Sequence, residues 1–273
     1  MRPLLVLAIA VGCASAAGPQ PDATEVIRRS VQKIEDDWKQ APQYSFIERD
    51  VESKHHSTPV VKTYQVLMID GSQYNELIAI NDRPLSPGER AEEESKLRAE
   101  VIKRGHESDR ERRKRIARFI KERDQDHAML KEMVEAFDFR LVGEANLEGH
   151  NCWVFDAEPK PGYQPKTRET KVLLGMRGKL WIDKSQYQWV RVEAEVMRPV
   201  SLYGVFAKVG PGTHFSLEQA PVAGDLWLPT HFSVNVKATA FGFINEDSVN
   251  DETYRQYKPM PSLAELETAP VAR

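Results

Sequence analysis

Apolar residues recur at two different spacings along the chain, and these spacings separate helical from strand-like segments. Between residues 23 and 40 they fall three or four positions apart, which predicts an amphipathic helix that ends before Pro42. Residues 44–81 contain three strand-like runs, with a turn signal at Asp70-Gly71. From residue 139 to residue 258, apolar and polar positions alternate in short runs, which predicts antiparallel strands joined by turns.

The alternation is most regular in two of these runs. In 188–198 the valines at alternate positions are expected to face one side of the strand, and in 226–239 Phe232, Val234 and Val236 are expected to do the same. No helical crossover segments separate the runs, which argues against a doubly wound parallel sheet. The remaining strands of this part are predicted over residues 139–145, 151–158, 170–175, 178–184, 201–209, 213–220 and 252–258.

Between the two strand regions lies a densely charged block, residues 87–137, in which basic and acidic residues are nearly balanced. Gly105 divides it into two predicted helices, 87–104 and 107–137. The second helix carries a narrow apolar stripe, so it is expected to dock along one edge and to be solvated elsewhere. Its basic run, residues 110–118, is interpreted as a solvated face paired with neighbouring acids, and the alternative is a site for anionic lipid headgroups or phosphates.

Residues 1–16 have the pattern of an export signal. A basic start precedes the apolar run 4–11, which is too short to span a bilayer. Small residues allow cleavage after Ala16, and the mature chain would then begin at Ala17. Alternatively, the residues up to Cys13 resemble a bacterial lipobox, and an acylated Cys13 would then anchor the protein to a membrane. Both alternatives predict an exported, periplasmic protein.

Composition narrows the possible functions. The chain of 273 residues has 38 basic and 41 acidic residues and a formal net charge of -3, which argues against a protein that holds nucleic acid through bulk charge. Its two cysteines exclude a disulfide-rich scaffold, and Cys152 is expected to be buried as a small apolar residue. The sequence contains no nucleophile elbow, Walker loop or zinc motif. We therefore expect a protein without catalytic residues, cofactor or metal.

Two stretches carry a resemblance to a known family. Residues 178–183, Gly-Lys-Leu-Trp-Ile-Asp, followed by residues 189–193, resemble the paired strands of the outer-membrane lipoprotein-sorting superfamily, which includes the carrier LolA, the receptor LolB and the sensor RseB. Residues 224–231, with the long strand after them, resemble the next hairpin of such chains. The strand 44–50 lacks the Phe-x-Gln pattern of the carriers, and the charged block is unusually long. No individual functional residue is therefore carried over.

The resemblance implies an α+β fold in which a curved antiparallel β-sheet, an unclosed half-barrel, wraps around helices. The domain would cover residues 17–258, with the block 87–137 as a charged helical insertion and residues 259–273 as a flexible tail. An unclosed sheet leaves a concave apolar face. Such a face implies a non-catalytic binding protein for lipid, acyl chains or lipoproteins of the cell envelope.

The predicted ligand face is the apolar side of the strands described above. Its residues are Leu180, Ile182, Val190, Val192, Val196, Phe232, Val234 and Val236. The competing interpretation is that these side chains pack on the helices and leave no cavity. A second functional hypothesis is an envelope protein-interaction or sensor module, in which the charged helices and a free sheet edge bind another protein without lipid. The expected partners are a lipid or acylated protein, or another envelope protein, with membrane contact peripheral at most and without nucleic acid.

Overall fold

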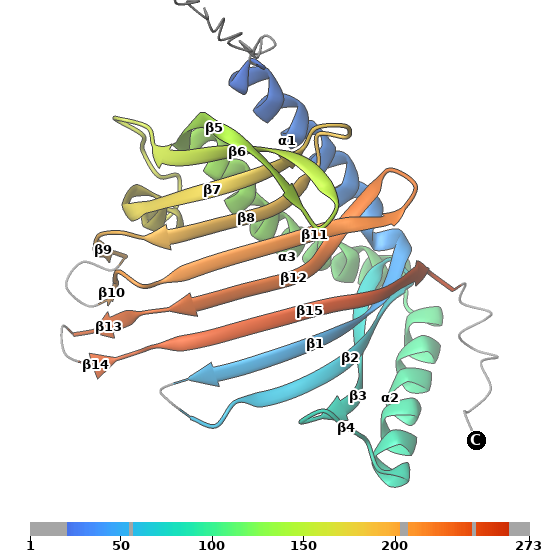
Figure 1. The fold of residues 1–273 in the computed structure, drawn as a ribbon. Coiled ribbons are helices and arrows are strands. Elements are labelled where there is room, and N and C mark those ends of the chain that lie inside the picture. The colour runs from blue at the N-terminus through green and yellow to red at the C-terminus, as the bar shows by residue number, and fades with distance from the viewer. Residues whose placement is uncertain (1–20, 55–56, 203–206, 242–243, 262–273) are drawn as a thin grey trace, which may run out of the picture.

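The computed structural model describes residues 21–54, 57–202, 207–241 and 244–261. Its main element is an eleven-stranded antiparallel sheet with the order β4-β3-β2-β1-β15-β12-β11-β8-β7-β6-β5 (Figure 1). The two edge strands, β4 and β5, do not pair with each other, so the sheet stays open. The predicted α+β fold with an unclosed half-barrel is thereby confirmed.

The strands of the large sheet run in long antiparallel pairs. They are β1 (Tyr44–Lys54), β2 (Val60–Ile69), β3 (Ser72–Ile80), β4 (Arg83–Pro84), β5 (Phe137–Leu147), β6 (His150–Pro159), β7 (Met176–Asp183), β8 (Trp189–Val196), β11 (His214–Ala223), β12 (Leu226–Val236) and β15 (Ser248–Pro259). A small second sheet lies at one end of these strands (left in Figure 1). It consists of β9 (Val200–Ser201), β10 (Ala207–Val209), β13 (Ala238–Ala240) and β14 (Ile244–Asn245).

Three α-helices begin at well-formed caps. The Asp22 side chain caps α1 (Ala23–Gln40). In α2 (Pro87–Gly105) and α3 (Asp109–Ala136), a serine and the glutamate three residues later exchange hydrogen bonds in a capping box. Two short 3-10 helices are η1 (Ala41–Gln43), after α1, and η2 (Glu169–Gly175), before β7. No described helix is both long enough and apolar enough to cross a membrane.

α1 packs on the face of the large sheet that carries Leu180, which we call the inner face. Two buried polar contacts fix its position. The Trp189 indole N–H donates to the Ser30 hydroxyl at 2.9 Å, and the Gln188 amide donates to the Asp37 carboxylate at 2.7 Å. Burial raises the pKa of Asp37 to about 6. These contacts satisfy polar groups that would otherwise be costly to bury, so they specify where the helix docks.

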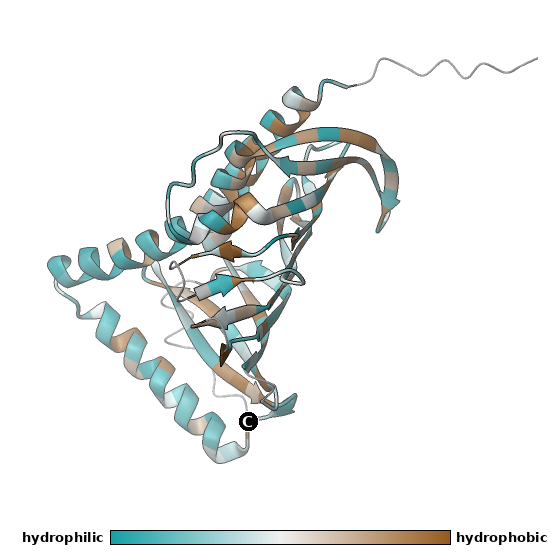
Figure 2. Cartoon of the chain, turned by 90° about the vertical axis from the view of Figure 1, so that its left-hand side faces the viewer, coloured by the Kyte–Doolittle hydropathy of each residue, from teal (hydrophilic) through white to brown (hydrophobic). Residues whose placement is uncertain are grey.

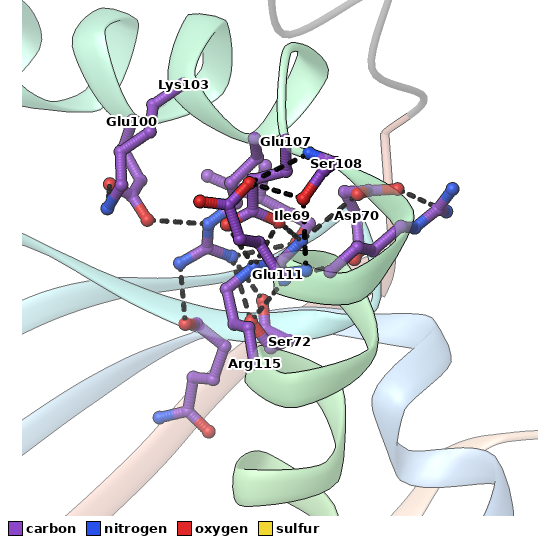
Figure 3. Close-up of polar contacts among 12 residues, drawn as sticks. Ile69, Asp70, Ser72, Glu100, Lys103, Glu107, Ser108, Glu111 and Arg115 are labelled. Atoms are coloured by element: carbon purple, nitrogen blue, oxygen red, sulfur yellow. Dashed lines mark hydrogen bonds and ion pairs between the residues drawn. The ribbon is translucent and has the colours of Figure 1, made fainter.

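α2 and α3 together hold the turn between β2 and β3. Arg104 of α2 donates to the backbone carbonyls of Ile69 and Ser72, both at 2.8 Å. Arg115 of α3 donates to the backbone carbonyl of Asp70 at 3.1 Å and forms an ion pair with its carboxylate (Figure 3). Both guanidinium groups are almost fully buried. The charged block is therefore attached to the sheet at a specific turn.

Neighbouring residues of β2 point to opposite faces of the sheet. Leu67 and Ile69 pack against Val101 of α2. Val66, directly before Leu67, pairs with Phe46 of β1 and points to the inner face. α2 therefore covers the face opposite to the inner face at this edge of the sheet.

The structure differs from the sequence analysis at three predicted strands. Residues 170–175 form η2, because a short apolar run can pack equally well as a helical turn. The strand predicted over 201–209 is replaced by the short strands β9 and β10 of the second sheet. The strand predicted over 226–239 is divided after Val236, because the backbone N–H of Lys237 turns away to the Thr213 hydroxyl, at 2.9 Å.

The predicted termini are only partly described. The signal 1–16, Cys13 and residues 262–273 of the predicted tail lie outside the described residues. β15 continues to Pro259, and Met260 packs against the cluster of Leu67 and Ile69. The folded part therefore extends past residue 258.

Candidate functional site

The residues predicted to bind a ligand lie in two regions of the sheet that differ in burial. We call the inner face of β5, β6, β7, β8 and β11 the covered part, because α1 and α3 pack on it. We call the inner face of β12, β15 and β1 the open part, because its side chains are only half-buried. At its border, Phe232 packs against the core of the covered part and contacts Phe215, with ring centroids 5.4 Å apart. The open part consists of Phe232, Val234, Val236, Asn250, Glu252, Tyr254, Phe46, Glu48 and Asp50.

The covered part is filled with side chains. Leu180, Ile182, Val192 and Val196 are each 5% exposed or less. A void between α3 and these strands measures about 20 Å³, which is room for about one water molecule. These four predicted ligand residues thus form the core under the helices, and an acyl chain has no space among them.

Val190 does not lie on the inner face, so its predicted orientation was wrong. β8 has a bulge at this point, and Val190 is the extra residue that β7 does not pair with. Trp189 consequently packs on the inner face, whereas Val190 packs with Cys152 and Trp227 on the opposite face. A bulge inverts the alternation on one side of it, and a regular polar-apolar pattern does not reveal where it occurs.

The register of the strands places apolar and acidic side chains next to each other in the open part. Phe232 of β12 lies opposite Glu252 of β15, and Glu252 lies opposite Asp50 of β1. The next inner-face pair along β1 and β15 is Glu48 with Tyr254. We call the carboxyl groups of Glu48, Asp50 and Glu252 the acidic row. It borders an apolar edge formed by Phe232, Val234 and Val236.

Two carboxyl groups of the acidic row, those of Glu48 and Asp50, have raised pKa values. Burial, together with Glu252 and Asp50, raises the pKa of Glu48 to about 7. Burial and the facing carboxylate of Glu252 also raise the pKa of Asp50, and Lys62 on β2 partly opposes this effect. Like charges directly opposite each other in a sheet are destabilising. The row therefore carries a stability cost at neutral pH.

Partners for these carboxylates within the chain are few. Glu252 accepts hydrogen bonds from the Asn250 amide, at 2.7 Å, and from the Tyr254 hydroxyl. One oxygen of Asp50 is buried without a hydrogen-bond partner. In the described parts of the chain, no lysine, arginine or histidine forms an ion pair with any of the three carboxylates. The open part thus offers acceptors that a cationic or hydrogen-bonding ligand would satisfy.

The opposite face of the sheet is different, because charges there are paired. His231 of β12 contacts the Asp251 carboxylate at 2.9 Å, and Arg191 of β8 contacts the Glu218 carboxylate at 2.7 Å. Both acids have a basic partner on a neighbouring strand. Unpaired carboxylates are therefore a feature of the inner face in this region.

Cys152 is fully buried and packs with Val190 and Trp227 on the face opposite to the inner face. Burial raises the pKa of the Cys152 thiol to about 11, so it remains protonated and unreactive, as its predicted burial implies. Among the described residues, no three His, Cys, Asp or Glu side chains are placed to hold a metal ion. What the open part combines is apolar contact area, negative charge and hydrogen-bond acceptors.

Sequence reasoning missed the acidic row. The alternation of Phe46, Glu48 and Asp50 along β1 was visible, but it does not say which face of the sheet they share. That depends on the pairing of β1 with β15, two strands about 200 residues apart in the chain. Spacing within a segment carries no information on such a pairing.

Sequence comparison finds no matching family model and no matching curated protein. Among solved structures, the chain is similar to a DUF1329 family protein from Desulfovibrio piger, at 13% identity over 90% of this chain and 97% of that chain, with a TM-score of 0.33. It is similar to a LolA superfamily protein from Nitrosomonas europaea, at 10% identity over 91% and 98% of the two chains, with a TM-score of 0.30. It is also similar to a chain of the MucA/MucB complex from Pseudomonas aeruginosa, at 10% identity over 87% of this chain and 100% of that chain, with a TM-score of 0.23.

Proposed function

We propose that this chain is a non-catalytic, exported binding protein of the cell envelope, and that its ligand lies on the open part of the inner face. Apolar groups of the ligand would contact Phe232, Val234 and Val236. Cationic groups of the ligand would lie beside the acidic row. An acylated protein segment with lysine or arginine near its acyl chain offers both kinds of group.

The observation that supports this proposal is the contrast between the two parts of one sheet face. In the covered part, the predicted ligand residues Leu180, Ile182, Val192 and Val196 are buried core, and a void beside them measures about 20 Å³. In the open part, the same alternation of apolar residues continues in half-buried side chains beside unpaired carboxylates. Partly buried apolar side chains next to unsatisfied charges favour a binding surface over a sealed core.

The charge of the acidic row favours some ligands over others. Carboxylates repel the phosphate of an anionic phospholipid and attract the side chains of lysine and arginine. A bound cation would lower the pKa of Glu48 from about 7, because it stabilises the charged form. Binding of a cationic segment would therefore release protons, and its affinity should rise as the pH increases through 7.

A second candidate function is the recognition of a protein segment without an acyl chain. The filled covered part favours it, since an acyl chain would have only the open part to lie on. Both candidates use the same surface and differ in whether lipid is bound.

Native mass spectrometry of the full-length protein, purified from a bacterial envelope, separates the two candidates. An acylated peptide or a lipid in the spectrum supports the first. A protein that carries no lipid and ignores added lipids, but binds a lysine-rich amphipathic peptide, supports the second. A protein that binds none of these ligands contradicts both.

A pair of neighbouring substitutions on β15 tests where the ligand lies. Glu252→Gln removes a charge from the inner face, whereas Asp251→Asn removes one from the opposite face. We expect Glu252→Gln to weaken binding of a lysine-containing peptide by about five- to tenfold, equivalent to the loss of roughly 1 kcal/mol, as measured by titration calorimetry. Asp251→Asn is expected to leave the affinity unchanged. Equal effects of the two substitutions would place the ligand elsewhere.

A further inference from the structure

The basic residues of α3 fall into two groups in the structure. Arg112 and Arg115 pair with Asp70 at the β2–β3 turn, and Arg123 donates to the Trp38 backbone carbonyl at 2.6 Å. The second group is exposed and forms no ion pair with any described residue. It consists of Arg110, Arg113, Lys114 and Arg118. The expected pairing with neighbouring acids therefore accounts for only part of the basic run.

The unpaired cations share one face of the helix with apolar surface. At 3.6 residues per turn, Arg110, Arg113, Lys114 and Ala117 project on the same side of α3, opposite Arg112 and Arg115. The surface on this side is shallow and open, and α3 alone supplies it. Its lining residues are Ala117, Ile120, Lys121, Asp124, Gln125 and Ala128. Ile120 is 48% exposed. We call this side of α3, from Arg110 to Ala128, the free face.

Contacts on the opposite side of α3 fix the free face in position. Arg115 fixes the first turns of α3 to the β2–β3 turn. Farther along the helix, His127 stacks on Trp38 of α1 with ring centroids 4.5 Å apart. The helix between these contacts projects from the sheet and is largely hydrophilic (Figure 2). No ordering of the helix is needed before a partner binds, which reduces the entropic cost of binding.

We propose that the free face of α3 docks the protein on an anionic lipid bilayer. The charges are complementary, because four unpaired cations and Lys121 are exposed, and Asp124 is the one acid among the residues that line the shallow surface. Exposed Ile120 and the two alanines provide the apolar contact that an interfacial helix places at the level of the headgroups. This surface is separate from the open part of the sheet. Membrane docking through the free face therefore does not depend on which ligand the open part binds.

The magnitude of the attraction makes the proposal measurable. A lysine or arginine close to an anionic membrane surface strengthens binding by about fivefold. Removal of three such cations should therefore weaken binding on the order of a hundredfold. The attraction should also decrease as salt is added, because exposed charges are screened.

The test is flotation of the full-length protein with vesicles of phosphatidylcholine containing 30% phosphatidylglycerol, compared with phosphatidylcholine alone. A triple variant carries Arg110→Gln, Arg113→Gln and Arg118→Gln. Its matched control carries Arg83→Gln, Arg90→Gln and Arg98→Gln, which lower the net charge equally at exposed positions of β4 and α2. Glutamine is a good helix former, so both variants are expected to keep their helices.

We expect the wild-type protein and the control to float with the anionic vesicles. The triple variant is expected to remain in the unbound fraction. Ile120→Ser should weaken binding to a smaller extent. Equal binding to vesicles without phosphatidylglycerol would overturn the proposal, as would equal loss in the control. Self-association through the free face, detected as a dimer that the triple variant abolishes without any vesicle binding by the wild type, would also overturn it.

Discussion

In the covered part of the inner face, Val196 is fully buried beneath α3 and η2, whereas Val234, two strands away in the open part, is only half-buried. Both valines stand in strands that alternate apolar and polar residues. What separates them is the position of the helices, which is fixed by specific contacts such as Trp189 with Ser30. The alternation of a strand thus identifies its apolar side, and the docking of helices decides whether that side becomes core or surface.

The largest expected difference between the two parts is in their response to pH. The pKa of Glu48 is about 7 in the folded protein and ordinarily 4.5. The folded state therefore holds this proton more tightly, and its contribution to stability is lost as the pH rises from about 4.5 through 7. The loss is on the order of 3 kcal/mol, at 1.36 kcal/mol per pKa unit.

Thermal unfolding of the wild type and of Glu48→Gln at pH values from 4.5 to 8 measures this effect. The variant should lose less stability over the range and should be the more stable protein at pH 8. Asp37 remains in the variant. Because its pKa is raised to about 6, the free energy of unfolding of the variant should still decrease with increasing pH, but by less than that of the wild type. Parallel curves for the two proteins would show that Glu48 titrates normally and that the open part is fully solvated.

A matched pair of substitutions tests the difference in packing. Val196→Ala removes two buried methyl groups from the covered part and is expected to reduce the free energy of unfolding by about 2 kcal/mol. Val234→Ala in the open part is expected to cost less than about 1 kcal/mol. Urea denaturation at pH 7 gives both values. Equal costs would mean that the open part is packed as core, and the proposed ligand surface would lose its basis.

The smallest expected effect is a change in the free energy of unfolding when one carboxylate is neutralised. Its sign differs between the two faces of the sheet. Asp50→Asn removes repulsion between facing carboxylates and should stabilise the protein by up to about 1 kcal/mol at pH 8. Asp251→Asn breaks the contact with His231 on the opposite face and should destabilise it by up to about 1 kcal/mol. Melting temperatures would differ by a few degrees in opposite directions. Destabilisation by Asp50→Asn would indicate that Asp50 has a partner in the folded protein.

The sequence was sufficient for the architecture and for most elements. The helices predicted over 87–104 and 107–137 agree closely with α2 and α3, because capping boxes and glycine mark their ends. The bulge at Val190 and the helical turn at 170–175 were not predictable, since each depends on packing against distant segments. The open part was recognised only through Phe232, Val234 and Val236, and its acids depend on the distant pairing of β1 with β15.

The attachment of α2 and α3 to the β2–β3 turn also bears on the order in which the protein folds. β2, β3, α2 and the start of α3 are consecutive in the chain, and Arg104 and Arg115 join them within about 45 residues. β1 and β15 close a loop of about 200 residues. Because short loops close at lower entropic cost, the segment from β2 to α3 is expected to form early and β15 to join late. In hydrogen exchange during refolding, amides on β15, which lies inside the sheet, would then gain protection after those on β2 and β3 near its edge.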